Sequence, residues 1–453
     1  MMNAHPAAAN NASSSSNRGK RRGWRGGGRR GRSGGRKTDR RVNGGDARIN
    51  SKNLNAAKAS AARPASSVVK RTNGDGCFMV GTCLKRCPQE EYICRRDDVA
   101  GGLSLLEQPH CRMPHLPPER DLVVKKLKRS SAGVTFAPSE VRTCETLVET
   151  MEYLLTLMDA DGMGPDARFE ESAAFGSGDR PTPAFIMSFC ADRTRSIRKD
   201  FSLQGYLHAS GPLDAGSIRV HEMCARMHIM NDHMLCEIPE REGHNEVLNR
   251  QECNNCLKAL NVLYDKAARR GDSSLQSPRE AEFRSYYAIL NMETLPRGWL
   301  HDQFQSRPLI RDDAHIQLAA KIIRAFRCDD FESFFQLVQS PSTPYMTSCI
   351  MHGFFRSMRA SAIRILKKAV RGKHFFAHIA RQLAFETQCE ATEFLQSRGI
   401  ASSSKQNDQD ASFTFDPKIA LREPVKPFPR AVASFIARKR KQMRRDDIFC
   451  GAW

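Results

Sequence analysis

The chain has 453 residues and a formal net charge of +21 at pH 7, from 71 Lys and Arg residues against 50 Asp and Glu residues. Hydrophobic residues make up 40% of it, and no apolar run reaches the roughly 18 to 20 residues that a membrane-spanning helix needs. The 15 Cys residues are scattered, which excludes a disulfide framework and indicates a reducing compartment. We therefore expect two or three domains with a buried core and no membrane span.

Most of the charge lies in residues 1–75, where 18 Lys and Arg residues face three Asp residues, a net of +15. This segment is rich in Gly, Ser and Arg-Gly units and has little to bury, so we predict a disordered basic tail. Arg neutralises phosphate and Trp stacks on bases, so the composition is typical of RNA-binding tails. The candidate RNA contacts are Arg21, Arg22, Trp24, Arg25, Arg29 and Arg30. An import signal or a solubilising tail remains an alternative.

Cys and His residues are frequent in residues 77–120, but their spacing is irregular and they include no paired C-x-x-C knuckle. Cys253 and Cys256 do form a C-x-x-C pair, yet Cys256 falls on the apolar stripe of a predicted helix. We therefore predict buried or packed cysteines, no metal site and no cofactor.

The stretch Phe189 to His208, FCADRTRSIRKDFSLQGYLH, is the densest charged helical pattern in the chain. Ile197 and Phe201 lie four residues apart and share one face, which leaves the charges on the others. The charged residues of the motif are Asp192, Arg193, Arg195, Arg198, Lys199 and Asp200. Three interpretations are open: a buried structural network, a solvated face with weak ion pairs, and a phosphate-binding site.

Beyond residue 183 the chain is predicted to be almost entirely helical, with apolar residues at helical spacing and no strict repeat. Successive amphipathic helices favour stacked helical hairpins. Ser277, followed by Pro and by Glu280, predicts a capped helix start. The acidic pairs 312–313 and 329–330 stand where further helices should begin, which suits capping.

Residues 376–416 change character. Two short helices, the second stopped by Gly399, are followed by a polar loop and an alternating strand, ASFTFD, a pattern that indicates a winged helix. The candidate RNA contacts of this module are Lys373, His374, Arg381, Arg398 and Lys405. Packing of the wing on a partner protein is the alternative.

A basic helix is predicted at residues 429–445, RAVASFIARKRKQMRR within it. Such clusters occur in import signals, in RNA contacts and in solvated termini, and we favour the first two. The whole chain lacks H-E-x-x-H, G-x-S-x-G and Walker-type motifs, so we expect no enzyme.

The order of motifs is informative as a set. GTCLKRCP, DLVVKKLKRSSAG and ETLVETMEYLL precede DRTRSIRKDF, and LNRQECNNCLKALNVLYD and PREAEFRSYYAILN follow it. This set, from about residue 81 to about residue 440, resembles the Sac-three/GANP family of nuclear mRNA-export scaffolds. The resemblance implies a mainly α fold: an irregular, PCI-like helical-repeat body over 76–372, a small winged helix over 373–428 and a basic helix over 429–453.

The same resemblance implies partners and a location. The expected partners are mRNA, a PCI-domain winged-helix protein, a small acidic protein of the Sem/DSS type and nuclear pore components. The expected function is an RNA-binding scaffold that couples transcription to mRNA export in the nucleus. Short members of the family are associated with centrosomes and mitosis, so a cell-division interaction protein that does not touch RNA is the alternative.

Overall fold

The computed structural model describes residues 78–98, 102–108, 119–128, 135–160, 181–242, 244–369, 372–400, 412–415, 420–423, 428–440, 443 and 448–449. The chain divides into two units, Met1–Ser66 and Ser67–Trp453, and all described residues belong to the second. The predicted tail, with Arg21, Arg22, Trp24, Arg25, Arg29 and Arg30, and the loop residue Lys405 lie outside the described residues.

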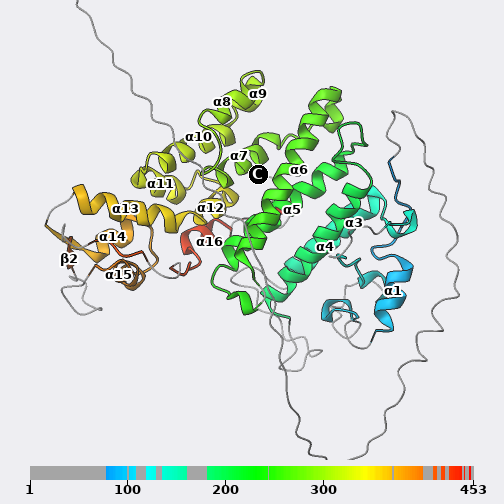
Figure 1. Ribbon diagram of the computed structural model, residues 1–453, viewed down its shortest axis with the longest axis horizontal. Coiled ribbons are helices and arrows are strands. Elements are labelled where there is room, and N and C mark those ends of the chain that lie inside the picture. The colour runs from blue at the N-terminus through cyan, green and yellow to red at the C-terminus, as the bar shows by residue number, and fades with distance from the viewer. Residues whose placement is uncertain are drawn as a thin grey trace, which may run out of the picture. The chain divides into compact units, whose positions relative to one another are not determined.

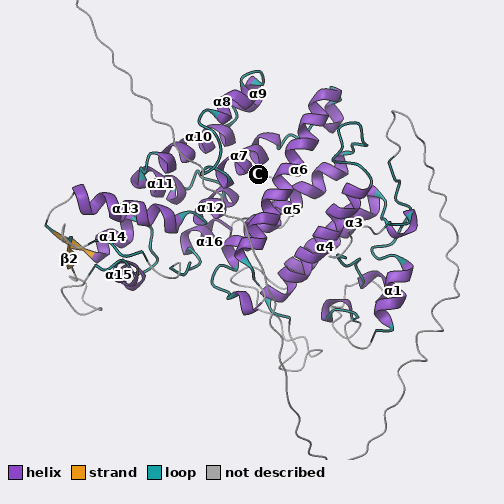
Figure 2. Cartoon of the chain, viewed as in Figure 1, coloured by secondary structure: helices purple, strands orange, loops and turns teal. Residues whose placement is uncertain are grey.

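The second unit is mainly helical, as predicted (Figures 1 and 2). Its α-helices are α1 (Gln89–Arg96), α2 (Glu119–Leu122), α3 (Cys144–Ala160), α4 (Pro183–Leu203), α5 (Ala215–Met234), α6 (Glu246–Arg270), α7 (Glu280–Leu290), α8 (Trp299–Phe304), α9 (Pro308–Arg311), α10 (Ala314–Arg327), α11 (Phe331–Gln339), α12 (Tyr345–His352), α13 (Phe355–Ala369), α14 (Phe376–Gln382), α15 (Gln388–Ser397) and α16 (Ser434–Arg440). None of the described helices is both long and apolar enough to cross a bilayer.

The helices stack on one another in chain order. Helix α3 packs on α4, α4 on α5, α5 on α6 and α6 on α7, and the series continues through α10 and α11 to α13. Most helices of this series therefore bury faces against two neighbours, which explains why sequence periodicity locates these helices well.

Side-chain caps fix several helix starts. Asp313 and Asp330 accept hydrogen bonds from the backbone N–H groups of His315 and Ser333, at 2.8 and 3.0 Å, so the prediction of capping is confirmed. The predicted cap at Ser277 is wrong. Helix α7 begins at Glu280 and its N-cap is Arg279, so Ser277 lies two residues before the cap position. Its hydroxyl still accepts from the backbone N–H of Arg279 at 3.2 Å, and it donates to Glu222 of α5 at 2.6 Å.

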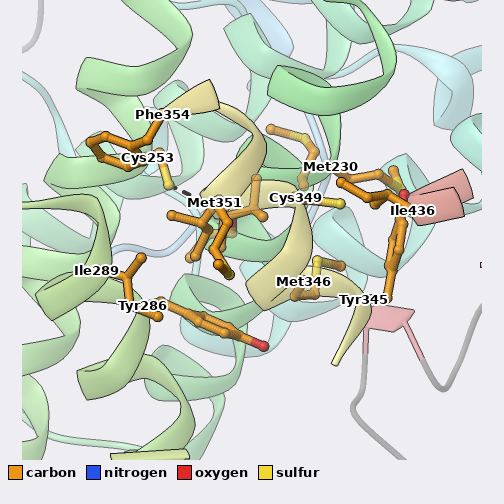
Figure 3. Close-up of a cluster of buried hydrophobic side chains, with 14 of the residues drawn as sticks. Met230, Cys253, Tyr286, Ile289, Tyr345, Met346, Cys349, Met351, Phe354 and Ile436 are labelled. Atoms are coloured by element: carbon orange, nitrogen blue, oxygen red, sulfur yellow. Dashed lines mark hydrogen bonds between the residues drawn. The ribbon is translucent and has the colours of Figure 1, made fainter. Parts of the chain in front are cut away.

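Helix α12 runs through the centre of the unit and touches α5, α7 and α16. Figure 3 shows Cys349 and Met351 of α12 among Met230 of α5 and Ile289 of α7, all of them buried. Soft, unbranched sulfur side chains fill the irregular space between helices that cross at different angles. Cys253 and Cys256 are buried core residues of α6, as predicted.

After α13 the described chain forms a small mixed module. Strand β1 (Lys373–Phe375) pairs antiparallel with β2 (Ser412–Thr414), with His374 opposite Phe413. Helices α14 and α15 lie between the two strands in sequence and pack on each other. Periodicity predicted both helices and β2 to within one or two residues, but β1 is too short to show an alternating pattern.

The C-terminal segment packs back onto the helical stack. Arg430 is 4% exposed and pairs with Asp232 of α5 at 2.9 Å, and Ile436 of α16 is fully buried. Lys439 donates to the backbone oxygens of Val338, Ser340 and Thr343, at 3.1, 2.8 and 2.8 Å. The described helix, Ser434–Arg440, begins five residues after the predicted start at residue 429, and Arg430 and Lys439 satisfy internal acceptors.

Candidate nucleic-acid interface and the buried charge network

Helix α4 carries the charged motif and distributes it over three separate clusters. The first is centred on Asp200, which is fully buried. Its carboxylate accepts from Lys125 Nζ at 2.6 Å and from Arg142 Nε at 2.8 Å. Burial lowers the pKa of Lys125, and the charge of Asp200 opposes that shift. Asp200 therefore joins α4 to the segments before α3 and after α2.

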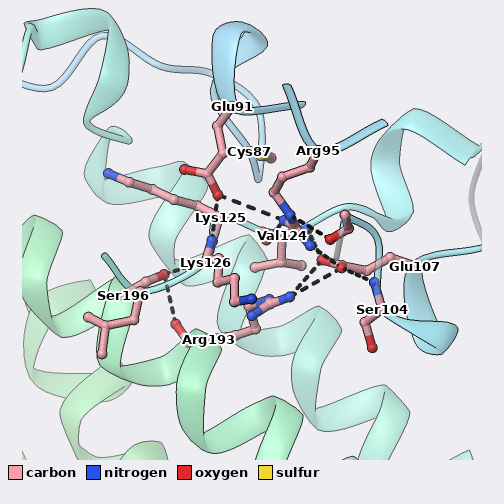
Figure 4. Close-up of polar contacts among 12 residues, drawn as sticks. Cys87, Glu91, Arg95, Ser104, Glu107, Val124, Lys125, Lys126, Arg193 and Ser196 are labelled. Carbon is pink, nitrogen blue, oxygen red and sulfur yellow. Dashed lines mark hydrogen bonds and ion pairs between the residues drawn. The ribbon is translucent and has the colours of Figure 1, made fainter. Parts of the chain in front are cut away.

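The second cluster is centred on Glu107, which is also fully buried (Figure 4). Arg95 of α1 and Arg193 of α4 both donate to this carboxylate, Arg193 at 3.1 and 3.2 Å. The backbone N–H groups of Ser104 and Val124 add two further bonds, at 3.0 and 3.1 Å. Every lone-pair direction of the buried acid is thereby used, which is what a charge in a low-dielectric interior requires.

The third cluster joins α4 to α6. Glu252 forms an ion pair with Arg195, at 3.2 Å from its Nε, and accepts a hydrogen bond from Arg198 Nη2 at 2.6 Å. Burial alone would raise the pKa of Glu252, but the neighbouring Arg198 outweighs it and the pKa is lowered. Asp192 pairs with Arg193 at 2.6 Å, whereas Lys199 makes no ion pair with a described residue.

These contacts leave little of the motif open to a ligand. The side chains of Arg193 and Arg198 are 4% and 12% exposed, and only that of Arg195 reaches 30%. The guanidinium groups hold carboxylates from other parts of the chain, so the geometry fits a structural network better than a phosphate site.

The basic residues of the small module are in different surroundings. Lys373 and Arg381 are exposed and make no ion pair with a described residue. His374 packs against the rings of Phe413 and Phe415, at centroid distances of 5.6 and 5.2 Å, and burial lowers its pKa. Arg398 pairs with Glu423 at 2.8 Å and its side chain is 13% exposed. Two of the four described candidates are therefore engaged within the fold.

Sequence reasoning missed other residues of this surface. Arg364 and Lys368 lie one turn apart on α13, both exposed, and with Lys367 they line a groove of about 520 Å³ that ends at Leu421. A second groove of about 570 Å³ is lined by Lys321 and Arg324 of α10. Asp329, in the turn between α10 and α11, borders the first groove, and the next residue, Asp330, borders the second.

An exposed aromatic side chain follows α13, on strand β1. Phe375 is 45% exposed, next to Lys373, whose Nζ lies 5.6 Å from its ring centroid. We call Arg364, Lys368, Lys373, Phe375, His378 and Arg381 the cationic face. The spacing of four residues between Arg364 and Lys368 is a signal in the sequence that could have located the α13 cations.

The chain matches a profile of the SAC3/GANP family over residues 86–404, which is most of its length. It belongs to the SAC3/GANP family. It is 29% identical over 348 residues to SAC3 family protein 1 of Schizosaccharomyces pombe, covering 71% of this chain and 30% of that protein. It is 27% identical to Protein xmas of Drosophila melanogaster over 341 residues, covering 71% and 14% of the two chains. It is 28% identical to SAC3 family protein B of Arabidopsis thaliana over 299 residues, covering 64% and 16%.

The chain thus spans less than a third of the length of these SAC3/GANP relatives. The family match contains all three charge clusters of α4 and continues through α14 and α15. Lys373, Phe375 and Arg381 of the cationic face therefore lie inside the SAC3/GANP region, whereas α16 lies beyond it.

No group of three or more His, Cys, Asp or Glu side chains among the described residues is arranged to hold a metal ion. Cys83 and Cys87 are both buried, and the Cys83 thiol donates to the backbone oxygen of Lys85 at 3.2 Å. Burial raises the pKa of Cys87 to about 12.

Proposed function

We propose that this chain is an RNA-binding scaffold that acts in nuclear mRNA export and is not an enzyme. The observation that carries the proposal is the cationic face, a run of exposed Lys and Arg side chains on α13, β1 and α14 together with the exposed ring of Phe375, from whose centroid Lys373 Nζ lies 5.6 Å. Cations for phosphates and an aromatic platform for bases are the two elements of single-strand recognition. Family membership supports the setting, since the resemblance noted above is to export scaffolds.

The architecture proposed for this role is a PCI-like stack of helices that ends in a winged helix. Supporting it is the order strand, helix, helix, strand from β1 to β2, directly after the last helix of the stack. Arg359 of α13 fastens the module to the stack, because its guanidinium donates to the backbone oxygens of Leu383 and Ala384, at 3.1 and 2.6 Å. A fixed module would present the cationic face in one orientation.

The partners we propose are mRNA, a second PCI-domain protein with its own winged helix, a small acidic protein of the Sem/DSS type and nuclear pore components. The proposed location is the nucleus. A centrosomal or mitotic role without RNA is the second candidate. Crosslinking of the chain to polyadenylated RNA in cells separates the two, because only the first candidate predicts a crosslink.

The direct test is charge reversal on the cationic face. The variant Lys368→Glu, Lys373→Glu, Arg381→Glu should weaken binding of single-stranded RNA and lower the slope of log affinity against log salt by about 2, because three phosphate contacts are lost. A matched control reverses three exposed cations elsewhere, Lys258→Glu, Arg269→Glu, Arg297→Glu, with the same change in net charge. Equal loss in both variants, or none in the first, would count against the cationic face.

A further inference from the structure

A small pocket lies between the first half of α4, the second half of α5 and the start of α6, apart from the cationic face. Its volume is about 130 Å³. Met187 of α4, Leu235 after α5 and Leu248 of α6 supply apolar walls, and His228, Asn231 and His244 supply polar ones. The charge clusters of α4 border it through Asp192, Arg195 and Glu252.

Three buried polar atoms in this lining have no hydrogen-bond partner among the described residues. They are Nε2 of His228, Oδ1 of Asn231 and Nε2 of His244, in residues that are 1%, 2% and 8% exposed. Buried polar atoms are almost always satisfied in folded proteins, since each unpaired one costs about 1 to 3 kcal/mol. Three around one cavity indicate that something else supplies their partners.

The protonation of His228 can be read from its neighbours. Its Nδ1 lies 2.8 Å from Oδ1 of Asn249, and Nδ2 of Asn249 donates to the His228 backbone oxygen at 2.9 Å, which fixes the orientation of the amide. Nδ1 must therefore carry the proton, and Nε2 is an acceptor. Oδ1 of Asn231 is an acceptor too, so the pocket offers two acceptors and needs a donor.

The charge around the pocket narrows the choice of donor. Two acceptors repel an anionic group. The acids Asp192 and Glu252 also line the pocket, but Asp192 is paired with Arg193, and Glu252 with Arg195 and Arg198, so the lining offers no unpaired carboxylate to a cation. A neutral donor remains. The guanidinium of Arg195, partly exposed, can in turn donate to a carbonyl of the same ligand.

Exposed apolar side chains lie beside the pocket lining. Phe185 follows the lining residue Ala184, and Val247 precedes the lining residue Leu248. Their exposed fractions are 40% for Phe185, 79% for Val247 and 41% for Leu248. Large apolar residues grouped at a polar pocket are typical of protein-docking surfaces.

We propose that this pocket binds the side-chain amide of a Gln or Asn residue of a partner protein, with apolar residues on either side of that amide packed on Phe185, Val247 and Leu248. The amide N–H groups satisfy His228 and Asn231, and the amide carbonyl accepts from Arg195. The proposal is independent of RNA binding, so either can fail without the other.

The test uses the full chain and four acetylated heptapeptides with the same Leu residues around a central Gln, Glu, Lys or Leu. We expect the Gln peptide to bind about tenfold or more tightly than the other three, measured by calorimetry. Asn231→Leu, which keeps the side-chain volume and removes the acceptor, should abolish that preference. Val247→Asp should weaken binding of the Gln peptide at least several-fold. The control variant Leu309→Asp, at a remote exposed apolar site, should leave that binding unchanged.

Melting curves verify that each variant is folded. Val247 lies on the surface, so Val247→Asp still tests the proposal if Asn231→Leu does not fold. Equal binding of the four peptides, or a Gln preference that survives both changes, would overturn the proposal. Failure of every peptide to bind would mean that only water fills the pocket, which would overturn it as well.

Discussion

The α4 motif and the cationic face are both rich in Arg and Lys, but their surroundings are opposite. On α4, Arg193 and Asp200 are 3% and 0% exposed, and their charges are balanced by residues from distant parts of the chain. On the cationic face, Lys373 and Arg381 are exposed and have no described counter-ion. The comparison teaches that burial and pairing, rather than density of charge, distinguish a structural network from a binding surface.

The largest effect should come from the buried side of the comparison. Asp200→Ala leaves Lys125 and Arg142 buried without their acid, so we expect the free energy of unfolding to fall by about 3 to 5 kcal/mol in urea titrations. Lys199→Ala, one residue away and without a described ion pair, should change it by no more than about 0.5 kcal/mol. Similar losses in both would mean that the network does not stabilise the fold.

Low pH should lower the free energy of unfolding through the buried histidines. Burial lowers the pKa of His221, His228 and His233 to about 4, whereas an unfolded histidine titrates near 6.5. The unfolded state therefore binds more protons between these values, and the stability that is present above pH 6.5 is lost as the pH falls toward 4. Each histidine should contribute about 1.4 kcal/mol per pH unit in that window.

This dependence can be assigned to a single residue. His221→Gln should lower the slope of unfolding free energy against pH, between pH 6.5 and 4, by about one proton. The exposed His301 provides the control, and His301→Gln should leave the slope as it is. An unchanged slope in His221→Gln would show that His221 is protonated in the folded protein at these pH values.

The exposed side of the comparison should respond in RNA binding and hardly in stability. If one base stacks on the ring, Phe375→Ala should weaken binding of single-stranded RNA by about 1 to 3 kcal/mol, which is a loss of about 5- to 150-fold in affinity. Phe185→Ala removes an equally exposed ring at a distant part of the surface and should not affect RNA. An unchanged affinity for RNA in Phe375→Ala would mean that no base stacks on Phe375.

The smallest effect should separate two arginines of the same module. Arg381→Glu should lower the salt slope of RNA binding by about 0.7, the value for one phosphate contact on a single strand. Arg398→Glu should leave that slope unchanged, because Arg398 already pairs with Glu423, and should slightly lower the melting temperature by placing two acids together. A salt slope that falls in Arg398→Glu and stays unchanged in Arg381→Glu would mean that Arg398, and not Arg381, contacts the RNA.

The sequence by itself determined the mainly helical fold, the family and most helix positions, including the capping roles of Asp313 and Asp330. These features depend on spacing within a few residues, because amphipathic periodicity and caps are local. The high density of charge on α4 and the four-residue spacing of Arg364 and Lys368 are also visible in the sequence. The sequence could not say which of these cations was paired.

Only the tertiary structure decided that question, because an ion pair is made by residues far apart in the chain. Arg142 meets Asp200 across 58 positions, and Arg430 meets Asp232 across 198. The same long-range packing brought the Ser277 hydroxyl to Glu222, placed His374 against two rings and grouped His228 and Asn231, each with one unsatisfied polar atom, around a pocket. Burial changes the free energy of a charge by several kcal/mol, and burial is a property of the folded whole.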